Sequence, residues 1–235
     1  MKRPSRRTRF SLILAVALSP GLSVLAQEVS GQGAAVAIVF DTSGSMRDSV
    51  QDAAGKPAPK YVIGVRALKQ IVNRLAAAES AGGPVPRKIE ASLVVFENGR
   101  AQTAVPYGPF RAAAFEQWAD AFKQPNGATP LGDSMDRAAR DLMRSTLPHK
   151  HILVITDGMN TAGPKPEAVL ERLQQQARRA ETSLAVHFVA FDVSAEVFKP
   201  VRDLGATVVG AADEAELNAQ LGYIVERKIL LEDVE

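Results

Sequence analysis

Residues 34–46 read AAVAIVFDTSGSM, so seven apolar residues run directly into the polar turn DTSGSM. An unbroken apolar run of this length is typical of a strand that is covered on both faces, as in a parallel sheet. Asp41, Ser43 and Ser45 alternate in the turn, so their oxygen-bearing side chains can point to one side as the chain leaves the strand. The stretch predicts a buried strand with a cluster of oxygen ligands at its carboxyl end.

Five more runs predict strands, and amphipathic stretches lie between most of them. The further strand candidates are 89–96, 101–105, 151–156, 184–191 and 207–209, and the helix candidates are 61–78, 110–122, 131–145, 166–180, 195–204 and 214–225. In the helix candidates, apolar residues recur every three or four positions. This alternation predicts an α/β fold of three layers: an open, doubly wound, mostly parallel six-stranded sheet with helices on both faces.

One junction breaks the alternation. Only four residues, 97–100, separate the second and third strand candidates, and Asn98-Gly99 within them is a strong signal for a tight hairpin. The third strand is therefore expected to run antiparallel at one edge of the sheet. With no internal repeat or long linker, the chain is expected to form one domain over residues 34–228, with a short linker at 27–33 and a tail at 229–235.

The first 26 residues predict a secretory signal peptide. Residues 1–10 hold five basic residues and no acidic one, residues 11–18 are mainly apolar, and Val24-Leu25-Ala26 has the character of a cleavage site. An uncleaved membrane anchor is the alternative, but the apolar run is short for a bilayer span. Arg6-Arg7 suggests twin-arginine export, but Phe10 lies one position later than that signal requires. We therefore expect export by the ordinary secretory route to the periplasm, with no membrane span after cleavage.

Charge and cysteine content exclude several classes of function. The chain has 28 basic and 26 acidic residues, but without the leader 23 basic residues face 26 acidic ones, a net charge of −3. The basic character therefore belongs to the leader and gives no support to nucleic-acid binding. Because the chain has no cysteine, disulfides, thiolate metal sites and a cysteine nucleophile are excluded.

Two further polar loops are expected near the turn after the first strand. The fourth strand candidate also ends in an acid, at Thr156-Asp157-Gly158, and the loop Gly127-Ala128-Thr129-Pro130 leads into a helix candidate. In a doubly wound sheet of order 3-2-1-4-5-6, strands 1 and 4 are neighbours at the switch point where ligands bind. If the sheet has this order, Asp41 and Asp157 flank one crevice.

The residue types indicate which ion such a crevice would hold. Two carboxylates and three hydroxyls, without His or Cys, are hard oxygen donors; they favour Mg²⁺, with Mn²⁺ or Ca²⁺ as alternatives, over zinc. If the neutral hydroxyls bind directly and the carboxylates act through water, the cation stays electrophilic. An acidic side chain of a partner protein can then complete its coordination.

These three parts together resemble a known pattern. Asp41-x-Ser43-x-Ser45, Thr129 in Gly-x-Thr-Pro and Asp157 in Thr-Asp-Gly are similar to the metal ion-dependent adhesion site (MIDAS) of von Willebrand factor type A domains. The resemblance covers nearly all of the mature chain. It implies that Ser43, Ser45 and Thr129 are direct ligands, that Asp41 and Asp157 act mainly through water, and that the domain binds proteins in a Mg²⁺-dependent way.

Signatures of catalysis are missing. Ser43 interrupts any Asp-Thr-Gly of an aspartic protease, and the sequence has neither a Gly-x-Ser-x-Gly elbow nor a phosphate-binding Gly-rich loop. We therefore expect a binding module that is not an enzyme. An accessory subunit that docks to an enzyme or envelope assembly is the alternative, and a Mg²⁺-dependent hydrolase ranks below both because no separate general base is apparent.

Several polar residues outside the five ligands also have expected roles. Residues 47–60 form a polar, Pro- and Gly-rich connection that is expected to overhang the crevice and to contribute to partner choice; a mobile connection without a role is the alternative. Asn160 is expected to form a turn, Asp192 to lie at the rim, and His187 to be packed in the core. The pair His149-x-His151 is expected to flank the start of a strand and not to bind a metal.

Overall fold

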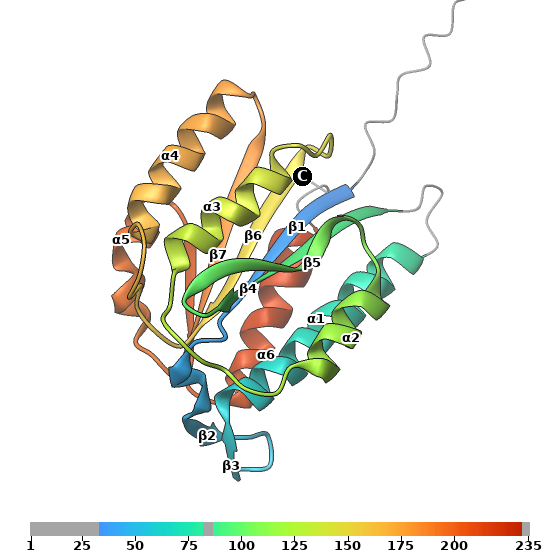
Figure 1. The fold of residues 1–235 in the computed structure, drawn as a ribbon. Coiled ribbons are helices and arrows are strands. Elements are labelled where there is room, and N and C mark those ends of the chain that lie inside the picture. The colour runs from blue at the N-terminus through green and yellow to red at the C-terminus, as the bar shows by residue number, and fades with distance from the viewer. Residues whose placement is uncertain (1–32, 82–86, 232–235) are drawn as a thin grey trace, which may run out of the picture.

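The computed structural model describes residues 33–81 and 87–231, which form a three-layer α/β domain (Figure 1). The predicted signal peptide, residues 1–26, lies outside the described residues. No helix in the described ranges is long and apolar enough to cross a membrane. One six-stranded sheet has the order β5-β4-β1-β6-β7-β8. Its strands are β1 (Gly33–Phe40), β4 (Lys88–Glu97), β5 (Arg100–Pro109), β6 (His149–Thr156), β7 (Ser183–Phe191) and β8 (Thr207–Ala211).

The sheet has the strand order that the sequence analysis assumed. β1 pairs in parallel with β4 on one side and with β6 on the other, and every residue of β1 is buried. Val36, Ile38 and Phe40 pack on one face of the sheet, whereas Ala37 and Val39 pack on the other. Two apolar layers therefore explain why this strand is an unbroken apolar run in the sequence.

The antiparallel edge is also confirmed. β5 pairs antiparallel with β4, and the turn between them places Asn98 at φ 50° and Gly99 at φ 72°. Two successive residues with positive φ are the signature of a tight hairpin turn, which Asn-Gly adopts at little steric cost. β5 continues to Pro109, beyond the predicted end at 105, and its pairing with β4 shifts in register on both sides of Leu93.

Helices cover both faces of the sheet, as Figure 1 shows. On one face lie α1 (Lys60–Ser80), α2 (Ala112–Ala121) and α6 (Glu214–Tyr223); on the other lie α3 (Leu131–Leu142), α4 (Pro166–Arg179) and the short α5 (Lys199–Asp203), which a 3-10 turn (Ala195–Phe198) precedes. A π-helical turn, Ile224–Ile229, follows α6. Ile229 and Leu230, at the start of the predicted tail, are buried in the core.

The polar connection at residues 47–60 contains structure that the sequence did not indicate. A 3-10 turn (Gly44–Arg47) is followed by a small antiparallel hairpin of β2 (Ser49–Gln51) and β3 (Pro57–Pro59). Figure 1 shows this hairpin projecting beyond the carboxyl ends of the central strands. At its tip the Asp52 carboxylate accepts bonds from the backbone NH groups of Ala54 and Lys56, both at 2.9 Å. The connection is thus an ordered element beside the predicted crevice.

Candidate metal centre

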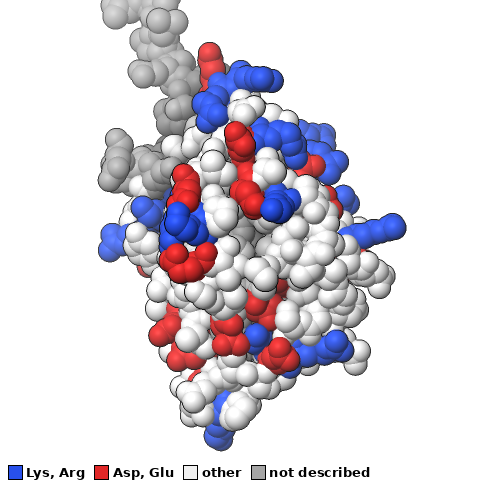
Figure 2. All heavy atoms as spheres, turned by 90° about the vertical axis from the view of Figure 1, so that its left-hand side faces the viewer, with Lys and Arg blue, Asp and Glu red and all other residues white. Residues whose placement is uncertain are grey.

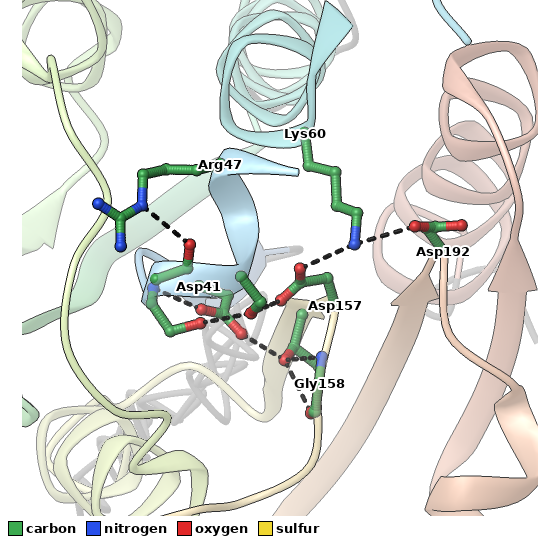
Figure 3. Close-up of polar contacts among 10 residues, drawn as sticks. Asp41, Arg47, Lys60, Asp157, Gly158 and Asp192 are labelled. Atoms are coloured by element: carbon green, nitrogen blue, oxygen red, sulfur yellow. Dashed lines mark hydrogen bonds and ion pairs between the residues drawn. The ribbon is translucent and has the colours of Figure 1, made fainter. Parts of the chain in front are cut away.

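The ends of β1 and β6 bring the predicted oxygen ligands together. Phe40, the last residue of β1, is paired with Ile155 of β6, so the residues that follow both strands leave the sheet side by side. Asp41 continues this pairing, because its backbone NH donates to the carbonyl of Ile155 at 2.9 Å. Figure 3 shows the carboxylates of Asp41 and Asp157 on the two sides of the turn that follows β1. The crevice therefore lies at the predicted switch point.

Asp41 is fully buried and held by donors from both strand ends. Its Oδ1 accepts the backbone NH of Ser43 at 2.7 Å, and its Oδ2 accepts the Oγ1 hydroxyl of Thr156 at 2.6 Å. Burial raises the pKa of Asp41 to about 6, against the lowering effect of these hydrogen bonds, and the negative charge of Asp157 adds to the rise. Its surroundings therefore disfavour the ionised form of this carboxyl group, and a nearby cation would stabilise that form.

A chain of hydroxyls connects the turn to Asp157. The Oγ atoms of Ser43 and Ser45 lie 3.1 Å apart, and the Ser45 hydroxyl donates to Asp157 Oδ1 at 2.7 Å. Thr42, whose side chain points the other way, fixes the turn to β4: its hydroxyl donates to the Phe96 carbonyl at 2.6 Å and accepts the Phe96 NH at 2.9 Å. The alternation in the sequence thus separates residues that line the crevice from one that anchors the turn.

Thr129 is brought to the site by its backbone. The loop that carries it is bonded to the turn after β1, through Gly44 NH to the Gly127 carbonyl at 3.1 Å and Asn126 NH to the Thr42 carbonyl at 2.8 Å. Thr129 is buried, and its backbone NH donates to the Thr161 hydroxyl at 2.8 Å. Hydrogen bonds among side chains and backbone therefore link Asp41, Ser43, Ser45 and Asp157, and Thr129 lies in the loop packed against them.

A lysine completes the cluster, as Figure 3 shows. The Lys60 ammonium lies 3.1 Å from Asp157 Oδ2 and 2.9 Å from Asp192 Oδ2. Burial alone would lower the pKa of Lys60, but the hydrogen bond with Asp192 and the charge of Asp157 outweigh it, so the pKa is raised. The ammonium is therefore a permanent positive charge at the edge of the crevice.

Lys60 was missed from the sequence, although a signal was present. It is the first residue of α1, and a cation at a helix N-terminus opposes the helix dipole. A lysine at such a position needs a compensating partner, which Asp157 and Asp192 provide. Thr156 was also missed. Its position next to Asp157 gave no indication that its hydroxyl would donate to Asp41, which follows the neighbouring strand.

Of the other polar residues, Asn160, His151 and His187 form contacts outside the ligand cluster, whereas Asp192 is joined to it through Lys60. Asn160 accepts the Gly132 NH at 3.3 Å and thereby ties its turn to the start of α3. His151 and His187 are both buried in the sheet, with ring centroids 5.6 Å apart and the rings stacked. Asp192 lies at the rim, as expected, with 42% of its side chain exposed.

The hairpin of β2 and β3 is fixed beside the site by a polar anchor. Arg66 of α1 forms a two-pronged bond with Glu214 of α6, at 2.8 and 2.7 Å, and the same carboxylate accepts the Ala53 NH at 2.9 Å. The hydrogen bond from Arg66 lowers the pKa of Glu214. In addition, the Lys60 NH donates to the Asp48 carbonyl at 2.8 Å. The hairpin is thus held at both of its ends.

The residues present fit a hard divalent cation. The atoms gathered in the crevice are hydroxyl and carboxylate oxygens, the ligands that Mg²⁺, Mn²⁺ and Ca²⁺ prefer. Within residues 33–81 and 87–231, no group of three or more His, Cys, Asp or Glu side chains has the arrangement of a metal site. The cluster holds two carboxylates, and hydroxyl groups supply its remaining oxygens.

Comparison with known proteins agrees with this fold. The sequence profile of the von Willebrand factor type A domain matches residues 35–219, and the chain belongs to this family. A comparison with curated protein sequences finds no match.

Solved structures share the fold at low sequence identity. The PilB minor pilin from Streptococcus sanguinis superposes with a TM-score of 0.63 at 16% identity, covering 84% of this chain and 61% of the pilin. The von Willebrand factor domain of the pilus tip protein Mfa5 from Porphyromonas gingivalis gives 0.62 at 14% identity, covering 83% of this chain and 95% of that domain. Proximal thread matrix protein 1 of the mussel byssus, with a zinc-occupied MIDAS motif, gives 0.59 at 16% identity over 83% of this chain and 48% of that protein. The chain thus spans less than two thirds of the pilin and of the byssus protein.

Proposed function

We propose that this chain is an exported module that binds a partner protein through a divalent cation held by Asp41, Ser43, Ser45, Thr129 and Asp157. The observation that carries the proposal is the continuous hydrogen-bonded path from Asp41 through Ser43 and Ser45 to Asp157, across the ends of two neighbouring strands. When bound there, a divalent cation supplies an electrophilic centre that accepts a carboxylate of the partner.

The protein donors around the two carboxylates support a site in which the hydroxyls bind the cation directly and the carboxylates act mainly through water. Asp41 already accepts bonds from Ser43 and Thr156, and Asp157 accepts bonds from Ser45 and Lys60. These donors hold each carboxylate in place and offset part of its negative charge. Neutral hydroxyl ligands would leave more positive charge on the cation, and a partner carboxylate is the group that this charge attracts.

Mg²⁺ is the cation that we propose, because hydroxyls, carboxylates and water suit a small hard ion. The byssus protein has zinc at its MIDAS motif, so the choice of metal in this chain needs a direct comparison. Competition among Mg²⁺, Mn²⁺, Ca²⁺ and Zn²⁺ at millimolar concentration tests it. Preference for Zn²⁺ over Mg²⁺ at equal free concentration would contradict our assignment of the metal.

The surface near the site favours a partner that depends on the cation. Figure 2 shows several acidic side chains, with basic ones among them, on the lower part of one face, toward the end that carries the β2–β3 hairpin. Asp192 and Glu216 line a shallow hollow beside the site. An acidic partner residue would be repelled by this surface unless a cation lay between the two carboxylates.

Export is part of the proposal. Residues 1–26 have the pattern of a secretory signal peptide, and two structural neighbours are a minor pilin and a pilus tip protein. We therefore propose a role outside the cytoplasm, in the periplasm. Cell fractionation with N-terminal sequencing of the mature chain tests both points, and recovery of the uncleaved chain from the cytoplasm would contradict them.

A pull-down from the native envelope fraction tests the function. With Mg²⁺, the wild-type domain should retain a specific partner that a chelator releases, and Thr129→Ala should weaken retention by about 100-fold because a ligand is lost. Thr103→Ala is the matched control, since it removes a threonine hydroxyl on the edge strand β5 that accepts a hydrogen bond from Arg137 of α3. Equal retention by Thr129→Ala, or retention that a chelator leaves unchanged, would refute the proposed function.

A further inference from the structure

Lys60 is a buried cation at the edge of the metal centre, and the proposed binding of a metal does not require it. Its side chain is 6% exposed, and its ammonium lies between the carboxylates of Asp157 and Asp192 (Figure 3). Of these two partners, Asp157 belongs to the proposed ligand set, whereas Asp192 follows β7 at the rim.

Two locally unfavourable features occur in the residues that form this contact. The first is the place of Lys60 at the N-terminus of α1, where the helix dipole disfavours positive charge. The second is the backbone of Asp192, which has φ 52°, a conformation that residues other than glycine seldom adopt. The Asp192 NH donates to the Ala211 carbonyl at 2.7 Å, which fixes this conformation at the end of β7. The two residues with these features meet in one contact, where the ammonium lies between two carboxylates.

The contact also determines which atoms of Asp157 are available. Oδ2 is engaged by Lys60 at 3.1 Å, and Oδ1 accepts the Ser45 hydroxyl at 2.7 Å. The lysine therefore turns the carboxylate toward the hydroxyl chain and offsets its charge. A divalent cation that binds next to this carboxylate meets a fixed positive charge of the same sign in a partly buried site, where like charges repel more strongly than in water.

We propose that Lys60 is a positioning residue that keeps the affinity of the site for its cation low, so that tight binding needs the carboxylate of the partner. This inference rests on the proposed function. The partner adds the negative charge that Lys60 has offset, and by linkage it strengthens the binding of the cation as much as the cation strengthens the binding of the partner. The metal centre then stays weakly occupied in the free protein and becomes fully occupied in the complex.

Two substitutions with opposite expected effects test the proposal. Lys60→Met removes the charge and keeps the length of the side chain, so affinity for Mg²⁺ in the free protein should rise by about tenfold or more. Asp192→Asn removes the other partner of the ammonium and makes the site more positive, so affinity should fall by severalfold. Isothermal titration of the mature domain with Mg²⁺ or Mn²⁺ measures both changes, and the shift of the melting temperature with cation gives a second readout.

Matched controls separate this role from a structural one. Lys69 lies in the same helix and pairs with the exposed Asp120. Lys69→Met should therefore leave cation affinity unchanged. Lys60→Arg keeps the charge and should keep the affinity near that of the wild type. A lysine that merely supported the fold would give weaker cation binding in Lys60→Met, and Asp192→Asn, at the rim, would change little.

The outcomes also separate this inference from the proposed function. Tighter binding in Lys60→Met together with weaker binding in Asp192→Asn supports the role of Lys60. Unchanged or weaker binding in Lys60→Met, with normal binding in the wild type, overturns it and leaves the metal centre standing. Failure of the wild type and of both variants to bind any divalent cation overturns the metal centre and this inference together.

Discussion

Polar groups lie at two levels along strands β6 and β7: a charged level at the carboxyl ends and a histidine level earlier in the strands. The two levels are stabilised in opposite ways. At the carboxyl ends, the carboxylates of Asp157 and Asp192 both contact the Lys60 ammonium, and Asp157 also accepts the Ser45 hydroxyl. Earlier along the same strands, His151 and His187 stack in the core, with ring nitrogens 3.4 Å apart. Burial lowers the pKa of His151 to about 3 and that of His187 to about 4.

The difference shows what a buried polar group indicates about function. An imidazole can lose its proton and become a neutral, aromatic part of the core, as His151 and His187 do at neutral pH. The Asp157 carboxylate at the sheet end has donors directed at it from two segments of chain, the turn after β1 and the start of α1, and the second donor is a buried ammonium. A cluster of carboxylates, hydroxyls and an ammonium, and not burial alone, is what distinguishes the proposed binding site from the histidine pair.

The largest effect is expected from removing a carboxylate at the charged level. Asp157→Ala leaves the buried Lys60 ammonium with only the half-exposed Asp192, so the domain in chelator should lose about 3 kcal/mol of stability. Asp157→Asn keeps the shape and an acceptor for Ser45, and it should cost less. Urea denaturation measures both variants. Wild-type stability of Asp157→Ala would show that the ammonium does not depend on this carboxylate.

The lowered pKa values of His151 and His187 predict that the domain loses folding stability in acid. In the unfolded chain the imidazoles take up protons near pH 6.5, whereas in the folded protein they stay neutral until about pH 3 to 4. Stability is therefore complete above pH 6.5 and falls as the pH drops through this window. After burial, the positive charges that lower these pKa values are those of His187, His149 and Arg87 for His151, and that of Lys228 for His187.

Replacing one histidine isolates this contribution. Between pH 6.5 and 5, His187→Leu should lose less stability than the wild type, by on the order of 2 kcal/mol. Asp41 acts with the opposite sign, because its raised pKa makes the folded protein take up a proton first as the pH falls from about 6 to 3.8. Since Asp41 is the same in both proteins, their difference removes its effect. Parallel curves of stability against pH would contradict the neutral state of the buried pair.

A smaller effect is expected at the hairpin beside the charged level. Arg66→Ala removes the two-pronged bond to Glu214 and should cost about 1 kcal/mol, because Arg66 is partly exposed. Arg66→Lys keeps the charge but loses the fork, and it should fall between the wild type and alanine. Thermal unfolding gives the stability, and amide hydrogen exchange at Ala53 reports the anchor. Unchanged exchange at Ala53 in Arg66→Ala would show that the fork does not hold the hairpin.

Local patterns in the sequence were enough to predict the strands of the sheet, and the switch point followed from an assumed strand order. The apolar run at 34–40 predicted a doubly covered strand, Asn98-Gly99 predicted the antiparallel edge, and the polar residues after two strands predicted the crevice. These features depend on chain geometry within a few residues, together with topological rules that hold across α/β folds.

Long-range contacts could not be predicted in this way. The bond of Lys60 with Asp157 joins residues far apart in the chain, and it depends on the reach of one flexible side chain. The hairpin of β2 and β3 has only three residues in each strand, too few for an alternating pattern. The stacking of His151 on His187 follows from the pairing of β6 with β7, which the sequence indicated only as neighbouring strands.

The position of a bound cation tests the central claim most directly. Crystals of the mature domain grown with Mn²⁺ should show one anomalous peak at the carboxyl ends of β1 and β6. That peak should lie about 2.0–2.6 Å from the hydroxyl oxygens of Ser43, Ser45 and Thr129. A peak elsewhere, or no peak at a Mn²⁺ concentration that saturates binding in solution, would contradict the account.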